Sequence, residues 1–204
     1  MNKNYLRKYF IMGSQDCDRD PAILLEEALQ AGITAFQYRE KGKGSLTGAD
    51  KVALGKKLRE LCREYQVPFI INDDVHLAEI LDADGIHVGQ EDEGVEGIRE
   101  KFPGKIIGLS ISNEKELRNS PVSLVDYIGA GPVFATATKE DAKQPVGTIW
   151  IQKLRGLCAD TPIVGIGGIN ESNAKQVIEA GASGVAVISA ITKARNIREI
   201  VERL

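Results

Sequence analysis

The 204 residues are enough for one domain or for a small α/β barrel, and 43% hydrophobic with 27% charged residues is an ordinary globular composition. The formal net charge of −3 excludes a basic field that would attract nucleic acid or an anionic membrane surface. No apolar run approaches the length of a membrane span, and the start MNKNYLRKYF has no apolar signal segment behind it. The cysteines Cys17, Cys62 and Cys158 lack metal-binding spacing, which indicates a reducing compartment. We therefore expect a cytoplasmic protein.

Short apolar strands alternate with helical segments along the whole chain. The expected strands are Tyr9–Gly13, Thr34–Arg39, Phe69–Ile71, Gly85–Val88, Ile106–Ser110, Tyr127–Gly129, Pro162–Ile166 and Val185–Ile188. The first helix has Asp20 as its cap and Pro21 at its first position, and Gly32 ends it. Later helices are expected at Leu46–Tyr65, Val75–Leu81, Val95–Lys101, Glu114–Asn119 and Ile149–Cys158, then after a cap at Asn170 or Ser172, and at the C-terminus. The longest helix has a core-facing stripe of Leu54, Leu58, Leu61, Cys62 and Tyr65.

Eight strand–helix units with no linker between them predict a single-domain (β/α)₈ TIM barrel over residues 1–204. The strands are almost continuously apolar, as expected when both faces of a parallel sheet are buried. A doubly wound open sheet is the alternative. It is less favoured because eight units suit closure and no GxGxxG follows the first strand.

Two acidic clusters follow neighbouring strands, Asn72-Asp73-Asp74 after the third and Gln90-Glu91-Asp92 after the fourth. A right-handed βαβ crossover makes these strands parallel, so both clusters should lie at the same edge of the sheet. Asp73 and Asp92 are therefore candidate ligands of Mg²⁺. Taken one at a time, acidic residues after strands are more often turn or cap residues.

The remaining strand ends supply polar, cationic and small residues at the same mouth of the barrel. They are Gln37, Arg39 and Lys41 after the second strand, Ser110 after the fifth, Thr136, Thr138 and Lys139 after the sixth, Gly167-Gly168 after the seventh and Ile188-Ser189 after the eighth. Small residues after strands seven and eight, each followed by a helix, are typical of a barrel phosphate site. The cations near two candidate metal ligands indicate a second, larger anion such as a diphosphate.

No Ser-His-Asp set is evident, and no cysteine is placed as a nucleophile. His87 alternates with Ile86 and Val88 and is interpreted as a residue of the barrel wall rather than a base. His76 is expected in the first turn of a helix. A site without a base or nucleophile suits transfer chemistry in which Mg-diphosphate departs.

Seven motifs occur in the order in which one enzyme family carries them. They are QYREK (37–41), FIINDD (69–74), DGIHVGQED (84–92), YIG running on to GPVF (127–134), TATK (136–139), VGIGGI (164–169) and ISAI (188–191). Over nearly its whole length the chain resembles thiamine-phosphate synthase, and the NDD, GQ-D and T-x-T-K elements together are quite specific.

The resemblance implies a (β/α)₈ barrel that joins hydroxymethylpyrimidine diphosphate to thiazole phosphate, giving thiamine phosphate and diphosphate. It implies that Gln37 hydrogen-bonds the aminopyrimidine and that Asp73 and Asp92 bind Mg²⁺. The residues implied to hold the diphosphate are Arg39, Lys41, Asn72, Ser110 and Lys139. Those implied to hold the thiazole phosphate are Thr136, Thr138, Gly168, Ile188 and Ser189. The implied mechanism is dissociative: diphosphate leaves, and the thiazole nitrogen captures a pyrimidine methyl cation.

Two features depart from the family. Many members have Ser-x-His after strand five, whereas this chain has Ser112 at the histidine position, and little sequence precedes strand one, so a lid on the bottom of the barrel is not expected. A related thiazole tautomerase and a non-catalytic barrel that binds thiazole phosphate are the alternative functions. Monomer and homodimer both stay open, and residues 42–48 and 138–147 are candidate lids over the substrates.

Overall fold

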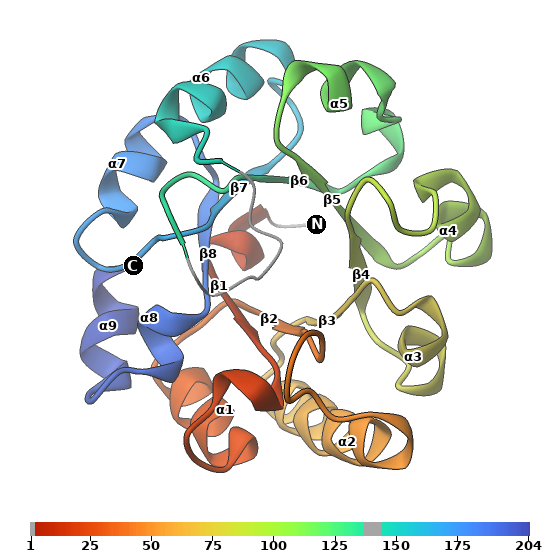
Figure 1. Ribbon diagram of the computed structural model, residues 1–204, viewed down its shortest axis with the longest axis vertical. Helices are drawn as coiled ribbons and strands as arrows, with labels where there is room; N and C mark the ends of the chain where they lie inside the picture. The colour runs from red at the N-terminus through yellow and green to blue at the C-terminus, as the bar shows by residue number, and fades with distance from the viewer. Residues whose placement is uncertain (1–2, 137–143) are drawn as a thin grey trace.

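The computed structural model describes residues 3–136 and 144–204, which form a closed barrel of eight parallel strands in sequence order (Figure 1). The strands are β1 (Lys8–Met12), β2 (Ala35–Tyr38), β3 (Phe69–Asn72), β4 (Gly85–Val88), β5 (Ile106–Ile111), β6 (Tyr127–Ala130), β7 (Ile163–Ile166) and β8 (Gly184–Val187). β1 pairs with both β2 and β8, which closes the sheet. The expected TIM barrel is confirmed, and the open sheet is excluded.

The helices form a ring outside the strands (Figure 1). They are α1 (Pro21–Gln30), α2 (Gly48–Glu64), α3 (Val75–Ile80), α4 (Val95–Lys101), α5 (Glu114–Asn119), α6 (Gly147–Leu157), α7 (Ala174–Glu179), α8 (Ser189–Thr192) and α9 (Ile197–Arg203), with 3₁₀ turns η1 (Lys3–Leu6), η2 (Ser14–Asp16) and η3 (Val122–Leu124). Of these, α8 was not expected. In the part of the chain that the structure describes, no helix is long and apolar enough to span a membrane.

Strand alternation divides the apolar side chains into two layers. One set packs between strands and helices, for example Phe36 and Ile71. The other fills the barrel interior and includes Leu6, Tyr9, Ile11, Ala35, Ile70, Ile106, Tyr127, Val164, Ala186 and Ile188. This division determines which side chains reach the mouth, because inward positions on each strand continue into the loop that follows it.

The expectation that the bottom of the barrel has no lid is wrong. Leu6 of η1 is fully buried in the interior layer, and its backbone lies so close to β8 that a Cβ on Gly184 would fall 1.8 Å from the Leu6 carbonyl oxygen. Figure 1 shows η1 as the red turn inside the ring of strands. Leu6 closes this end of the barrel, and the partly buried Tyr5 packs against the same interior layer.

Most local signals are borne out by the structure. The Asp20 carboxylate accepts a hydrogen bond from the Ala22 N–H at 2.7 Å and caps α1, and Gly32 follows the helix with φ +93°. Asn170 caps the turn that leads into α7, since its side-chain oxygen accepts from the Ser172 N–H at 2.9 Å, while Asn173 directly precedes the helix without a side-chain cap bond. One local expectation is wrong. Tyr65 is 36% exposed rather than part of the buried face of α2. It follows the last turn, where the helical spacing no longer applies.

Candidate active site at the carboxyl ends of the strands

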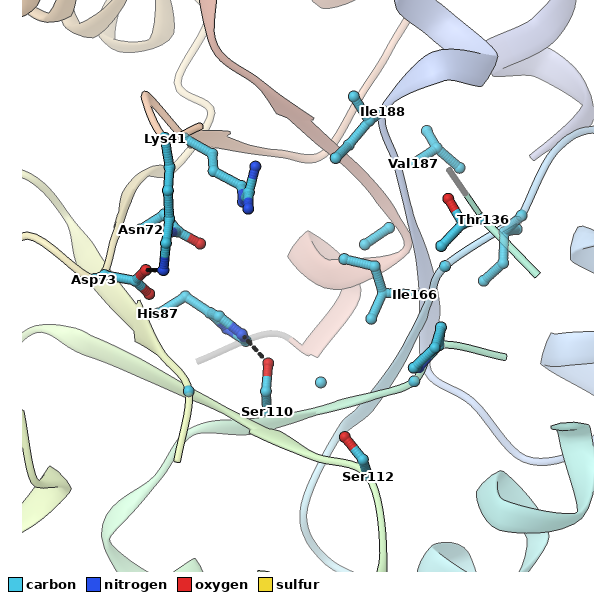
Figure 2. A pocket seen from close by; sticks show the side chains of 18 of the residues that line it. Lys41, Asn72, Asp73, His87, Ser110, Ser112, Thr136, Ile166, Val187 and Ile188 are labelled. Atoms are coloured by element: carbon cyan, nitrogen blue, oxygen red, sulfur yellow. Dashed lines mark hydrogen bonds and ion pairs between the residues drawn. The ribbon is translucent and has the colours of Figure 1, made fainter. Parts of the chain in front are cut away.

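A cavity of about 400 Å³ opens at the carboxyl ends of the strands. Predicted site residues from seven strand ends line it: Arg39, Lys41, Asn72, Asp73, Asp92, Ser110, Thr136, Gly168, Ile188 and Ser189. Figure 2 shows several of them around the opening. Gln37 lies beneath the cavity with 1% of its surface exposed, and the predicted residues Thr138 and Lys139 lie outside the described residues. The barrel therefore brings together side chains that are far apart in the sequence.

The cations Arg39 and Lys41 follow β2. Arg39 lines the cavity with only 6% of its surface exposed, and its guanidinium forms no ion pair with any residue that the structure describes. Lys41 lies 2.5 Å from the Asp73 carboxylate, and this hydrogen bond raises the pKa of the Lys41 ammonium. The Asp16 carboxylate acts on this guanidinium only through its charge, without a hydrogen bond. A buried guanidinium without an ion-pair partner is costly, so Arg39 is suited to pair with an anionic ligand.

The two candidate metal ligands follow β3 and β4. Asp73 has a left-handed backbone, φ +60°, that only a few non-glycine residues adopt, and its N–H donates to the His87 carbonyl oxygen at 2.9 Å. Asp92 accepts from the Gly89 N–H at 2.7 Å. Burial raises the pKa of the Asp92 carboxyl, and the nearby Asp73 carboxylate raises it further. Two acidic groups are thus held near each other.

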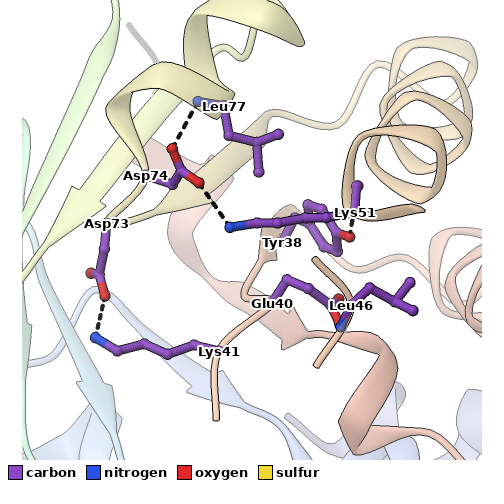
Figure 3. Close-up of polar contacts among 8 residues, drawn as sticks. All are labelled: Tyr38, Glu40, Lys41, Leu46, Lys51, Asp73, Asp74 and Leu77. Atoms are coloured by element: carbon purple, nitrogen blue, oxygen red, sulfur yellow. Dashed lines mark hydrogen bonds and ion pairs between the residues drawn. The ribbon is translucent and has the colours of Figure 1, made fainter. Parts of the chain in front are cut away.

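This donor set fits Mg²⁺. Among the described residues no cluster of three histidine, cysteine, aspartate or glutamate side chains could hold a metal. Magnesium commonly takes one or two carboxylates from the protein and its other oxygens from water and substrate phosphate. Asp74 has a different task, because its carboxylate caps α3 through the Leu77 N–H at 2.9 Å and pairs with Lys51 at 2.8 Å (Figure 3).

The opposite side of the cavity is built from small residues after β7 and β8. Gly167 and Gly168 have φ of +95° and +64°, and a Cβ on Gly168 would lie 2.5 Å from the Ala135 carbonyl oxygen. Only glycine allows this approach. α8 begins at Ser189, directly after β8, whereas α7 begins at Ala174, well beyond Gly168. The expected helix start therefore follows only one of the two strands.

The cavity floor contains groups that sequence reasoning did not assign. His87 lines the cavity, and its Nε2 lies 2.9 Å from the Ser110 hydroxyl (Figure 2). His87 lies in β4, as its interpretation as a residue of the barrel wall requires, and it also makes a polar contact there. Strand alternation places the side chain of His87 on the opposite face of the sheet from Ile86 and Val88, and this pattern could have predicted that His87 points into the barrel. Ser112 also lines the cavity, and His76 is exposed in the first turn of α3.

Comparison with known proteins decides the family. A family model described as thiamine monophosphate synthase matches residues 8–191. The chain belongs to the thiamine monophosphate synthase family. Within it, the chain is 62% identical to a thiamine-phosphate synthase of Oceanobacillus iheyensis, over 100% of this chain and 98% of the relative. It is 55% identical to one of Streptococcus suis, over 96% and 86%.

A solved member has the same fold. The thiamine phosphate pyrophosphorylase of Pyrococcus furiosus matches with a TM-score of 0.87 and 35% identity, over 99% of this chain and 95% of that one. The family and enzyme class expected from the motifs, a transferase of thiamine phosphate synthesis, are therefore confirmed.

Proposed function

We propose that this chain joins 4-amino-5-hydroxymethyl-2-methylpyrimidine diphosphate to hydroxyethylthiazole phosphate, with Mg²⁺ bound by Asp73 and Asp92. The products are thiamine phosphate and diphosphate. The observation that supports these substrates best is the buried Arg39 guanidinium, which forms no ion pair among the described residues, on the same rim as Lys41 and the two carboxylates. Cations beside metal-binding carboxylates suit a metal-bound diphosphate better than a single phosphate.

The proposed contacts divide the cavity in two. The diphosphate is held by Arg39, Lys41, Asn72, Ser110 and, outside the described residues, Lys139. The thiazole phosphate is held by Thr136, Gly168, Ile188, Ser189 and, outside the described residues, Thr138. The close approach of Gly168 to the backbone of the loop after β6 supports this second site, because both segments then face one ligand. Two anion sites on opposite sides of one cavity suit a reaction between two phosphorylated substrates.

The proposed reaction is a dissociative substitution. The bond between the pyrimidine methylene carbon and the diphosphate oxygen breaks, and its electron pair leaves with the diphosphate. The thiazole nitrogen then donates its lone pair to the methylene cation and forms the new C–N bond. Arg39 and Lys41 stabilise the negative charge that develops on the leaving oxygen, and no protein nucleophile takes part. Magnesium, when bound, neutralises further charge on the diphosphate oxygens.

Neither of the two rival functions accounts for a second anion site in the cavity. A barrel that only binds thiazole phosphate has no need of Asp73, Asp92 and the cations beside them. A thiazole tautomerase resembles the synthase but has a histidine after strand five and lacks the intact T-x-T-K, whereas this chain has Ser112 and TATK (136–139). We also propose a cytoplasmic location with small molecules, and no nucleic acid, as partners, in keeping with the net charge of −3.

The decisive experiment mixes the purified protein with both substrates, with and without Mg²⁺, and measures thiamine phosphate. We expect product that depends on Mg²⁺. If the protein bound thiazole phosphate but made no product, the non-catalytic or tautomerase function would be favoured. An assay with the substrate of the tautomerase would then separate these two functions.

A further inference from the structure

A buried chain of hydrogen bonds runs beneath the cavity and ends at its floor. The Gln37 side-chain NH₂ donates to the Tyr9 hydroxyl at 2.8 Å, and the hydroxyls of Tyr9 and Tyr127 lie 2.9 Å apart. The Tyr127 hydroxyl is 2.9 Å from His87 Nδ1, and His87 Nε2 is 2.9 Å from Ser110 Oγ. These hydrogen bonds link side chains from five strands, β2, β1, β6, β4 and β5, in one line that ends at Ser110.

Two glycines make room for this chain. In the strand register, Gly108 of β5 lies between His87 and Tyr127, and a Cβ there would fall 2.2 Å from the Tyr127 ring and 2.5 Å from His87 Nδ1. A Cβ on Gly129 would lie 3.0 Å from the His87 ring. The imidazole and phenol rings stack with centroids 5.4 Å apart. The close fit holds the two hydrogen-bonding atoms of the imidazole in line with their neighbours.

The direction of the chain follows from counting hydrogens. Burial raises the pKa of both tyrosines far above that of a free phenol, so each hydroxyl keeps one hydrogen to donate. Tyr9 accepts from the Gln37 amide, and among the described residues the Tyr127 oxygen is the only hydrogen-bond acceptor beside the buried Tyr9 hydroxyl, so Tyr9 donates to Tyr127. Tyr127 then donates to His87 Nδ1, which makes that nitrogen an acceptor.

The rest of the chain is then determined. A neutral imidazole with an accepting Nδ1 carries its proton on Nε2, so His87 donates to Ser110 Oγ. The Ser110 hydroxyl accepts there and directs its own hydrogen elsewhere. Because Ser110 lines the cavity, that hydrogen is available to a ligand oxygen.

We propose that Tyr9, Tyr127 and His87 are positioning residues, which keep the Ser110 hydroxyl a hydrogen-bond donor toward the cavity, with Gln37 as the first donor of the chain. A donor aimed at an anion forms a charge-assisted hydrogen bond, whereas a serine that gave its hydrogen to His87 would face the anion with lone pairs. The catalytic consequence rests on the proposed function, in which Ser110 contacts the diphosphate. The tautomer of His87 does not depend on it.

Nitrogen-15 NMR of the full chain tests the tautomer directly. The sequence has two histidines, and the other, His76, is exposed and serves as an internal reference. At neutral pH we expect His87 with an unprotonated Nδ1 and a protonated Nε2. In Tyr9→Phe and in Gln37→Met we expect both nitrogens to move toward the averaged shifts of mixed tautomers. A protonated Nδ1 in the wild type, or shifts unchanged in both variants, would overturn the proposal.

A double-mutant cycle separates positioning from direct substrate contact. We expect Tyr9→Phe and Gln37→Met each to lower kcat/KM for the pyrimidine diphosphate about tenfold, as for a weakened hydrogen bond to a charged group. The double variant should be no worse than either single one, because both act on the same chain. Additive losses would show that Tyr9 and Gln37 act separately and would overturn their shared effect on Ser110.

Tyr65→Phe is the matched control. Tyr65 is a surface tyrosine whose hydroxyl accepts from Gln30 at 3.2 Å, so its loss should leave kcat/KM and the His87 shifts unchanged. Cooperative thermal unfolding of each variant would verify that the barrel is folded. If the wild type made no thiamine phosphate, the proposed function would fail, while the NMR comparison would still decide the positioning role.

Discussion

The Lys41 ammonium lies 2.5 Å from Oδ2 of Asp73, across the ends of two adjacent strands (Figure 3). The pair places a cation and a candidate metal ligand on one rim of the cavity. Without substrate, Lys41 balances the Asp73 charge. In the proposed complex with a metal-bound diphosphate, the same ammonium would pair with a phosphate oxygen.

Replacing Lys41 by glutamine should lower kcat/KM for the pyrimidine diphosphate by roughly 100-fold, since a charge that stabilises the leaving anion is lost. Steady-state kinetics with the diphosphate varied would measure this. Lys51→Gln is the matched control, because Lys51 pairs with Asp74 at 2.8 Å and does not line the cavity. Equal losses in both variants would mean that Lys41 has only a structural role.

Asp92→Ala should abolish synthesis while thiazole phosphate binds within about twofold of the wild type, because a metal ligand is lost and the second anion site lies across the cavity. Calorimetric titration and the product assay would measure the two effects. Glu93→Ala, an exposed neighbour, should keep full activity. Unchanged turnover in Asp92→Ala would remove this residue from the proposed metal site.

Glu40→Ala should lower the free energy of unfolding by about 3 kcal/mol, since the buried carboxylate accepts charge-assisted bonds from both Ser14 donors and from the Leu46 N–H at 2.6 Å. Glu40→Gln should cost less, because an amide oxygen still accepts. Urea unfolding would measure both. Glu26→Ala on the exposed face of α1 should stay within about 0.5 kcal/mol of the wild type. An unchanged free energy of unfolding in Glu40→Ala would show that other contacts hold the loop at Leu46.

Stability should fall at alkaline pH. Burial raises the pKa of the Cys17 thiol to about 12 from 9.0 and that of the Tyr5 phenol to about 12 from 10.0. Between pH 9 and 12 the unfolded chain releases these protons while the folded chain keeps them, so the contribution present below pH 9 is lost as pH rises.

Urea midpoints measured at pH 8 and at about pH 10.5 would test this. The decrease should be smaller in a Cys17→Ser, Tyr5→Phe double variant. A midpoint with no pH dependence in the wild type would contradict the assignment.

Elements defined by short local sequence patterns were predicted most accurately. β4, α4 and α5 have the predicted bounds, because each is a short periodic segment between clear breakers. The residues of the mouth were also predictable, since closure of a parallel barrel brings every strand end to one side. Their individual roles in binding stay predictions.

The alternation of strands and helices, the strand-end side chains and the family motifs could be predicted from the chain alone, since they depend on residues near one another in sequence. That Leu6 closes the barrel and that Tyr127 reaches His87 across Gly108 follows from contacts between distant strands. The physical reason is register. Which inward side chains meet depends on how each strand is staggered against its neighbours around the closed sheet, and that long-range pairing leaves no local pattern in the sequence.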